Sequence, residues 1–179
     1  MNKSQFLPEK YTQSPVKGKV SWQSPSNIAL VKYWGKSNPQ IPKNASISFT
    51  LNNCHPYIYE YKMTIHSENS FPHSSGIASS ASGLSAIARC LMSLENEIST
   101  NLSAEFINKK ASFLARLGSG SASRSIEGPL VVWGNHPEIQ GSSDLFGVKF
   151  PYQVHSIFEN YQDVILLVDK GEKQVSSTI

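Results

Sequence analysis

The most informative part of the sequence is a loop of small residues that runs directly into a helical pattern. It covers residues 71–88 and reads FPHSSGIASSASGLSAIA. A helix N-terminus carries unpaired N–H groups and the positive end of the helix dipole, and Gly, Ala and Ser let a phosphate approach that backbone closely. The segment therefore predicts phosphate binding, most simply of a nucleotide. A Ser-rich turn that caps a core helix is the alternative interpretation.

A second segment, residues 24–36, gathers two lysines and a tyrosine around one glycine at the end of an apolar run. The three side chains are Lys32, Tyr33 and Lys36. A compact ammonium pairs well with phosphate, and a phenol can donate a hydrogen bond beside it. The segment thus predicts a second group of anion ligands. Because lysine is seldom buried, the alternative is that both lysines are the solvated ends of a surface strand.

A third segment, residues 116–125, reads RLGSGSASRS and offers four hydroxyls, two glycines and Arg124. Serine hydroxyls donate hydrogen bonds, and the planar guanidinium matches a phosphate or a carboxylate with two parallel bonds. The alternative is a connector between helices with a surface arginine. Three such segments in one chain predict a site for several negatively charged groups, which a nucleotide and a phosphorylated acid together would satisfy.

Composition limits the class of protein. The chain has 16 Lys and Arg against 13 Asp and Glu, and this net charge of +3 is too mild to indicate nucleic-acid binding. Cys54 and Cys90 have no metal-ligand spacing, so we expect free thiols and no metal site. The sequence has no apolar run long enough to span a membrane and no apolar leader, which favours a cytoplasmic protein that does not bind membranes.

The domain that must position these segments is expected to occupy residues 17–179. Residues 1–16 are polar, contain two prolines and show no periodicity, so we expect a loose lead-in arm there. A hydrophobic content of 39% is sufficient for a folded core. The order of the predicted elements, with strands first and then helices and more strands, indicates an α+β fold.

Hydrophobic periodicity predicts two helices, over residues 77–94 and 102–117, and Gly118 stops the second. Alternating or continuous apolar runs predict strands at residues 20–22, 28–33, 46–51, 61–65, 130–133 and 164–168. Residues 134–162 are rich in Gly, Pro, His and Ser and are expected to be mainly loop.

Five motifs, taken together and in this order, resemble the diphosphomevalonate decarboxylase family of the GHMP kinase superfamily. They are SNIALVKYWGK at 26–36, NASISFTL at 44–51, FPHSSGIASSASG at 71–83, GSGSASRS at 118–125 and VSST at 175–178. The resemblance extends over most of the chain from about Gly18. It implies an N-terminal lobe of the ribosomal protein S5 domain 2-like type, with a left-handed βαβ crossover. In the family this lobe packs on a C-terminal ferredoxin-like lobe, which we expect to be missing here.

The resemblance also implies an activity. Family members phosphorylate the tertiary hydroxyl of mevalonate 5-diphosphate with ATP and then release phosphate and CO2, which gives isopentenyl diphosphate in the mevalonate pathway. A Mg²⁺ ion that bridges the ATP phosphates is expected, because a bare triphosphate repels a second anion. The expected partners are therefore mevalonate 5-diphosphate and ATP, and a homodimer is expected by family analogy.

The same resemblance implies roles for individual residues. The ATP phosphates would lie at Ala78, Ser79 and Ser80, with Lys32 close to them. The substrate diphosphate would be held by a larger group, namely Tyr33, Lys36, Ser119, Ser121, Arg124 and Ser177. Lys32 and Arg124 are the candidate catalytic residues, and Arg124 also suits the carboxylate that is lost. A preformed cation at such a position stabilises charge without reorganisation.

Three departures from the family pattern qualify this assignment. The family's catalytic aspartate belongs to a C-terminal motif beyond Ile179, so we expect the 179-residue chain alone to be inactive and to end within a family motif. Residues 51–63 are several tens of residues shorter than the family spacing. His73 stands where the family often has a small polar residue and is expected to be a packing or exposed histidine. Three aspartates are expected to be turn residues or strand flanks, namely Asp144, Asp163 and Asp169.

Other functions remain open at this point. A mevalonate or phosphomevalonate kinase would share the Ser-rich loop, but kinases of the superfamily usually carry an aspartate in the loop that corresponds to residues 118–124. A decarboxylase that acts on the monophosphate is a closer alternative. A non-catalytic nucleotide-binding or dimerisation module is the alternative from a different class.

Overall fold

The computed structural model describes residues 3–6, 22–50, 56–59, 66–69, 78–99, 101–160, 162, 164 and 166. Its main sheet has four strands in the order β1 (Asn27–Val31), β4 (Ser46–Thr50), β7 (Leu130–Trp133) and β8 (Gly147–Lys149). Two small hairpins join β2 (Lys36–Ser37) to β3 (Ile41–Pro42) and β5 (Pro56–Tyr59) to β6 (His66–Asn69). The helices are α1 (Ser79–Ile98) and α2 (Ala104–Gly118), and three short 3-10 segments are η1 (Lys3–Phe6), η2 (Gly120–Ser125) and η3 (Ser156–Phe158).

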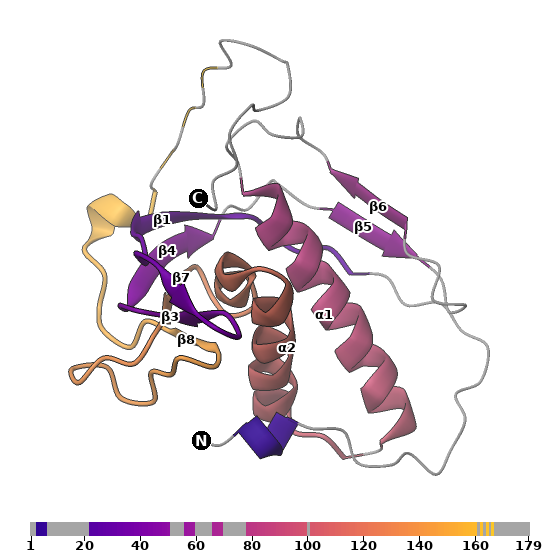
Figure 1. Cartoon of the computed structure of the whole chain (residues 1–179). Coiled ribbons are helices and arrows are strands. Elements are labelled where there is room, and N and C mark those ends of the chain that lie inside the picture. The colour runs from indigo at the N-terminus through magenta and orange to yellow at the C-terminus, as the bar shows by residue number, and fades with distance from the viewer. Residues whose placement is uncertain are drawn as a thin grey trace.

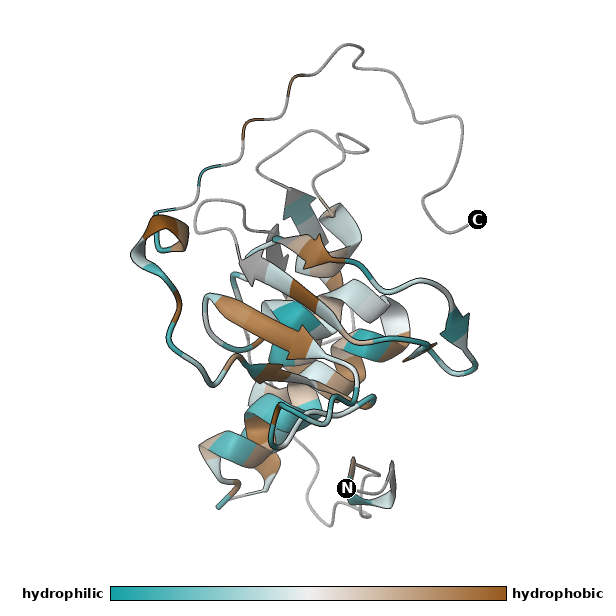
Figure 2. Ribbon diagram, turned by 90° about the vertical axis from the view of Figure 1, so that its left-hand side faces the viewer, coloured by the Kyte–Doolittle hydropathy of each residue, from teal (hydrophilic) through white to brown (hydrophobic). Residues whose placement is uncertain are grey.

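The two helices lie side by side on one side of the main sheet (Figure 1). In the view turned by 90°, the sheet stands in front of them (Figure 2). This arrangement confirms the expected α+β class. Every hydrogen-bonded strand pair of the main sheet is antiparallel, and the left-handed βαβ crossover that the resemblance implies stays a prediction.

Both predicted helices are confirmed. The first begins at Ser79 and continues to Ile98, four residues beyond its predicted end. The second begins after Ser103, whose hydroxyl accepts a hydrogen bond from the Phe106 N–H at 3.1 Å, and it ends at Gly118 as expected. A side-chain cap of this kind satisfies one of the free N–H groups of the first turn.

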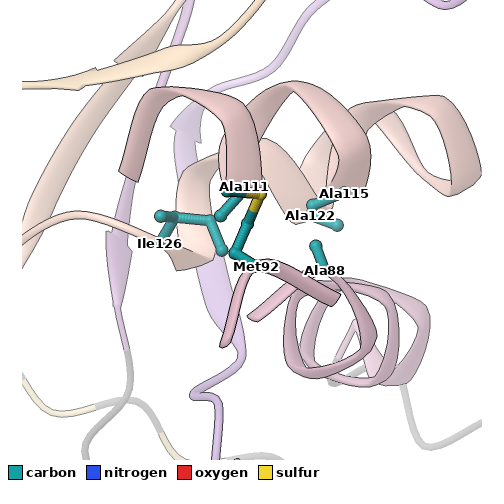
Figure 3. Close-up of a cluster of buried hydrophobic side chains, with 6 residues drawn as sticks. All are labelled: Ala88, Met92, Ala111, Ala115, Ala122 and Ile126. Atoms are coloured by element: carbon teal, nitrogen blue, oxygen red, sulfur yellow. The ribbon is translucent and has the colours of Figure 1, made fainter. Parts of the chain in front are cut away.

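A core of mainly small side chains joins both helices to the turn that follows α2. Its buried members are Ala88, Met92, Ala111, Ala115, Ala122 and Ile126 (Figure 3). Alanine at a helix contact lets the backbones approach closely, and burial of these side chains is favourable by about 25 cal/mol for each Å² of apolar surface removed from water. The segment η2 is therefore anchored to both helices through Ala122.

A second core cluster corrects the expectation for the N-terminal arm. Residues Lys3–Phe6 form η1, and the Phe6 ring stacks on Phe113 with centroids 4.7 Å apart and meets Phe146 edge-on at 5.9 Å. Phe6 is buried. Residues 1–16 are polar on average, but Phe6 is an aromatic residue that packs in the core, so this part of the arm is not loose. Residues 7–16 lie outside the described residues.

The strand predictions have mixed outcomes. The run at 130–133 is a buried strand as expected, and the run at 28–33 forms β1, which stops before Lys32. In contrast, Val164 and Leu166 belong to no strand and are 79% and 84% exposed, so the predicted buried strand at 164–168 is wrong at these two positions. An apolar run becomes a buried strand only where another layer covers it, and no described residue covers these two side chains.

Three further predictions concern the segment 134–162, two short strands and the cysteines. Residues 134–162 contain β8 and η3 in addition to loops. Trp22 lies outside any strand, whereas residues 20–21 and 61–65 lie outside the described part of the chain. Cys90 is a free thiol as expected, and burial raises its pKa; Cys54 is not among the described residues.

The alternation at residues 46–51 does form a strand over Ser46–Thr50, but its polar side is the buried one. Ser46 is 2% exposed and Ser48 is 0% exposed. In the sheet register Ser46 lies opposite Trp133 and Ser48 opposite Val131, so both hydroxyls share one face with the large indole. A buried serine face requires polar partners, and these come from η2.

Candidate anion-binding site

The fold brings the three predicted segments together at one end of α1. The Asn27 amide, at the start of β1, donates to the Ser121 carbonyl of η2 at 3.1 Å. Ser80, in the first turn of α1, lies 3.5 Å from Ser119, measured between the two hydroxyl oxygens. The α1 N-terminus, η2 and the start of β1 are therefore in direct polar contact.

The N-terminus of α1 receives no cap from the side chains that the structure describes. The residue at its cap position, Ala78, has no side-chain acceptor, and the first turn contains no acidic residue. Ser26 holds the cap residue by donating to the Ala78 carbonyl at 3.3 Å. The described serines of this segment therefore do not cap α1, and its first turn keeps N–H groups and the positive end of the helix dipole, which suit an anion.

Ser119, directly before η2, and Ser121, within it, adjoin this helix end. The Ser119 and Ser121 hydroxyl oxygens are 3.1 Å apart, and Ser119 also meets Ser80. All three hydroxyls can donate to an anion placed among them. The predicted ATP segment and the predicted substrate segment are consequently in direct contact.

Arg124 is buried and makes no ion pair among the described residues. Its Nη1 donates to the Ser46 hydroxyl at 2.6 Å and its Nε to the Ser48 hydroxyl at 2.8 Å. The side chain is 3% exposed, and burial lowers the pKa of Arg124 to about 10, an effect partly opposed by the nearby Tyr33 phenol. The alternative of a surface arginine is wrong. At neutral pH this guanidinium is a buried positive charge that a bound anion would stabilise.

Tyr33 links Arg124 to Lys36. The Tyr33 ring meets the buried Trp133 indole edge-on, with centroids 4.9 Å apart. The Lys36 ammonium and the Arg124 guanidinium each lie 5.7 Å from the Tyr33 centroid. An aromatic ring attracts cations to its face, so Tyr33 holds two positive groups in the same region.

Gly120 is the position where the indole comes closest to η2. A Cβ added there would lie 2.6 Å from Trp133 Cη2 and 3.4 Å from the Tyr33 hydroxyl. Because the indole is fully buried, we expect Gly120→Ala to lower the free energy of unfolding by about 1–3 kcal/mol. Urea denaturation measures this change.

Gly83 supplies the matched control. A Cβ at this position in α1 meets nothing within 4 Å. We therefore expect Gly83→Ala to raise the free energy of unfolding by about 0.5–1 kcal/mol through helix propensity. Equal effects of the two substitutions would contradict the assigned contact between Gly120 and the indole.

Lys32 is the predicted residue that the structure ties least firmly to the others. Asn44 fixes its backbone, because the Asn44 amide donates to the Lys32 carbonyl at 3.1 Å and accepts from the Trp34 N–H at 2.6 Å. The Lys32 side chain is exposed and has no hydrogen bond or ion pair within the described part of the chain. Its role stays a prediction.

Several predictions fall on residues that the structure does not describe. These are Ser177, His73, Asp163, Asp169 and the loop residues 71–77. Asp144 is described and acts as a turn residue, as expected. Its carboxylate accepts from the Asn135 N–H at 2.7 Å, and its carbonyl accepts from the Trp133 indole N–H at 3.0 Å.

The sequence interpretation missed the residues that hold Arg124 by hydrogen bonds. Asn27, Ser46 and Ser48 all contact Arg124. Serine repeated at alternate positions of a strand, beside a segment rich in arginine and serine, is the signal that could have identified them. Arg116 was also missed; it is fully buried and binds main-chain carbonyls.

Known proteins resemble this chain in sequence. The sequence model of the diphosphomevalonate decarboxylase-like N-terminal domain matches residues 24–59 and 57–144, a span that contains every predicted site residue except Ser177. The diphosphomevalonate decarboxylase of Ganoderma lucidum is 28% identical over 211 residues, which cover 87% of this chain and 50% of the relative.

Solved structures agree with this match. The mevalonate diphosphate decarboxylase of Staphylococcus aureus is 30% identical with a TM-score of 0.57, and the alignment covers 75% of this chain and 50% of that one. The enzyme of Enterococcus faecalis, solved to explain a mevalonate diphosphate mediated ATP binding mechanism, is 31% identical with a TM-score of 0.56, and the coverage is 77% and 52%.

The comparisons also bear on length. The chain spans about half the length of the curated relatives it matches. The alignment with the Ganoderma enzyme is longer than the 179 residues of this chain, so the relative has residues that this chain lacks.

No helix among the described residues is both long enough and apolar enough to cross a membrane. By its sequence match and its fold, the chain belongs to the family of diphosphomevalonate decarboxylase-like N-terminal domains.

Proposed function

We propose that the full-length protein is an ATP-dependent decarboxylase that converts mevalonate 5-diphosphate to isopentenyl diphosphate, ADP, phosphate and CO2. The observation that carries this proposal is that η2 holds the buried Arg124 charge, while Ser119, directly before η2, adjoins an α1 N-terminus that no described side chain caps. Such a pair of anion sites fits one phosphoryl donor and one anionic acceptor. The names of the relatives support the same reaction.

The proposed donor side is the start of α1. Ala78, Ser79 and Ser80 would bind the ATP phosphates through backbone N–H groups and hydroxyls, with Lys32 as an additional cation. The uncapped first turn fits this role, because a side-chain cap or an acidic residue would compete with phosphate. The solved enzyme of Enterococcus faecalis binds ATP and supports the proposal by analogy.

The proposed acceptor side consists of Tyr33, Lys36, Ser119, Ser121, Arg124 and Ser177, which would hold mevalonate 5-diphosphate. Arg124 is the residue best suited to the carboxylate, since its planar fork can donate two parallel hydrogen bonds. In the decarboxylation step the bond to the carboxyl carbon breaks, its electron pair forms the new double bond, and phosphate leaves. A fixed arginine orients the carboxylate for this step.

Magnesium fits the proposed site as a partner of the nucleotide. The described residues contain no group of three acidic, histidine or cysteine side chains that could hold a metal by themselves. Mg²⁺ commonly binds through substrate phosphates and few protein ligands, and it would offset the charge of the ATP phosphates. One solved complex of a relative contains MVAPP, AMPPCP and magnesium, which supports this part of the proposal.

The test is the stoichiometry of products. The full-length protein, given mevalonate 5-diphosphate and MgATP, is expected to release ADP and CO2 in a ratio of 1:1. ADP without CO2 would assign a kinase, and turnover of the monophosphate in preference to the diphosphate would assign a phosphomevalonate decarboxylase. The 179-residue chain alone is expected to give no turnover, since the proposed base is an aspartate outside it. The homodimer and the cytoplasmic location stay predictions.

A further inference from the structure

The described residues that bind Arg124 are all neutral. Ser46 and Ser48 accept from its Nη1 and Nε, and the Asn27 carbonyl oxygen lies 3.5 Å from its Nη2. All four side chains are buried. A buried arginine is ordinarily paired with a carboxylate, because an uncompensated charge is costly in the protein interior. The absence of a carboxylate among these partners is therefore a property to explain.

Two of the three acceptors, Ser46 and Asn27, are held in place by bonds of their own. The Ser46 hydroxyl donates to the Trp133 carbonyl at 3.3 Å, so its lone pairs are free to accept from Arg124. The Asn27 amide donates to the Ser121 carbonyl and to the Ser125 hydroxyl, which turns its oxygen toward the guanidinium. Because Ser46 and Ser48 alternate on one strand, they present both hydroxyls from the same face.

This arrangement leaves donors free on Arg124. A guanidinium has five N–H groups. The bonds to described residues use three of them, one on each nitrogen. The remaining two belong to Nη1 and Nη2, the pair that forms the end-on fork for a carboxylate or a phosphate.

We propose that Asn27, Ser46 and Ser48 are positioning residues that aim Arg124 with neutral acceptors and so preserve its whole charge for the anionic substrate. The proposal rests on the proposed function, in which that substrate is mevalonate 5-diphosphate. An aspartate at the position of Ser48 would fix the guanidinium equally well but would neutralise it. Selection of hydroxyls over carboxylates at these positions thus determines the affinity of the site for anions.

The experiment compares Ser48→Asp with Ser48→Asn in the full-length protein, because the two side chains differ in charge and not in size. We expect Ser48→Asp to weaken binding of mevalonate 5-diphosphate by about 100-fold relative to Ser48→Asn, while the Kd for MgATP is unchanged in both. Isothermal titration measures both constants. Equal weakening by the two variants, or no weakening by Ser48→Asp, would overturn the proposal.

A second pair of variants covers a failure of Ser48→Asp to fold. The double variant Ser46→Ala/Ser48→Ala removes two acceptors without adding charge, and the expected result is a loss of substrate affinity of about tenfold or more. Ser85→Ala is the matched control. Ser85 is also fully buried and bonds to main-chain carbonyls of its own helix, but it does not contact Arg124. Equal affinities of the double variant and Ser85→Ala would refute the positioning role.

Inorganic pyrophosphate separates this proposal from the proposed function. If the wild-type protein binds pyrophosphate but neither binds nor converts mevalonate 5-diphosphate, the proposed function fails while the charge comparison at Ser48 is still measured with pyrophosphate. If the wild type binds both and the variants do not differ, the proposed function stands and the positioning role fails. If the wild type binds neither anion, both are wrong.

Discussion

Replacing Arg124 by alanine is expected to lower the rate of CO2 release by about 10³-fold, while the Kd for MgATP changes little. The guanidinium is buried among Ser46, Ser48 and Tyr33, so neither water nor a neighbouring lysine can take its place without rearrangement. The ATP side of the proposed site depends on the α1 N-terminus and keeps its contacts. Turnover assays with separate nucleotide titration measure the two effects.

Arg124→Lys and Arg124→Met are the controls. Lysine keeps a charge but is a single point donor, so it cannot bind Ser46 and Ser48 and still present a planar fork; we expect it to recover little of the activity. Methionine keeps most of the volume and removes the buried charge, so its thermal midpoint shows whether the fold survives without that charge. Wild-type turnover in any of the three variants would remove Arg124 from the site.

Burial of Arg124 also determines how its contribution to the stability of the folded protein depends on pH. Burial lowers the pKa of Arg124 in the folded protein to about 10, well below its ordinary value. Between these two values the unfolded chain holds more protons, so the burial penalty is fully present below pH 10 and is relieved as the pH rises through this window. Near neutral pH the guanidinium keeps its charge, so anion binding through Arg124 is expected to weaken only as the pH approaches 10.

Replacing Arg116 by alanine is expected to produce the largest loss of stability, about 3–5 kcal/mol of the free energy of unfolding. This side chain is fully buried at the end of α2. Its Nε donates to the Leu145 carbonyl at 2.9 Å, and its Nη1 donates to the Pro39 and Gln40 carbonyls at 2.6 and 2.9 Å. The alanine variant leaves three carbonyls without this donor and opens a cavity between two loops.

Lys109→Ala is the matched control on the same helix. Lys109 pairs with Glu105 one turn away, and the carboxylate is exposed to solvent. A pair with one exposed partner contributes little to stability. The Lys109 ammonium also lies 5.8 Å from the Phe146 centroid, so we expect a small drop in the urea midpoint, well below that of Arg116→Ala. If Arg116→Ala unfolds at the same urea concentration as Lys109→Ala, the three carbonyl bonds do not stabilise the fold. Arg116 holds the β2–β3 turn at residues 39 and 40. Weaker binding of mevalonate 5-diphosphate to Arg116→Ala would therefore link this turn, through Lys36, to the site.

The helices and the convergence of the three segments could be predicted because their signals are local. The apolar periodicity of α1 and α2 and the stop at Gly118 depend only on neighbouring residues. The small and charged residues of the segments 24–36, 71–88 and 116–125 identify anion ligands by chemistry alone. Contacts such as Ser80 with Ser119 follow once both segments are assigned to one site.

The buried polar layer could not be predicted from local signals. Alternation on β4 shows that one face is buried, but by the usual rule the hydrophobic face would be inside. Burial of the serine face instead depends on Arg124, which lies 76 residues further along the chain from Ser48. Phe6 likewise depends on two distant aromatic rings, and the exposure of Val164 and Leu166 depends on what covers them.

The position of Trp133, in edge contact with Tyr33, means that its fluorescence can report anion binding at the site. Trp133 is fully buried and its ring lies 6.0 Å from the Arg124 guanidinium, whereas Trp22 and Trp34 are 37% and 79% exposed. Indole emission shifts with the local electric field, so neutralisation of Arg124 by a bound anion changes the short-wavelength part of the spectrum. In a protein with phenylalanine at both exposed positions, fluorescence would follow the filling of this site in real time without an added dye.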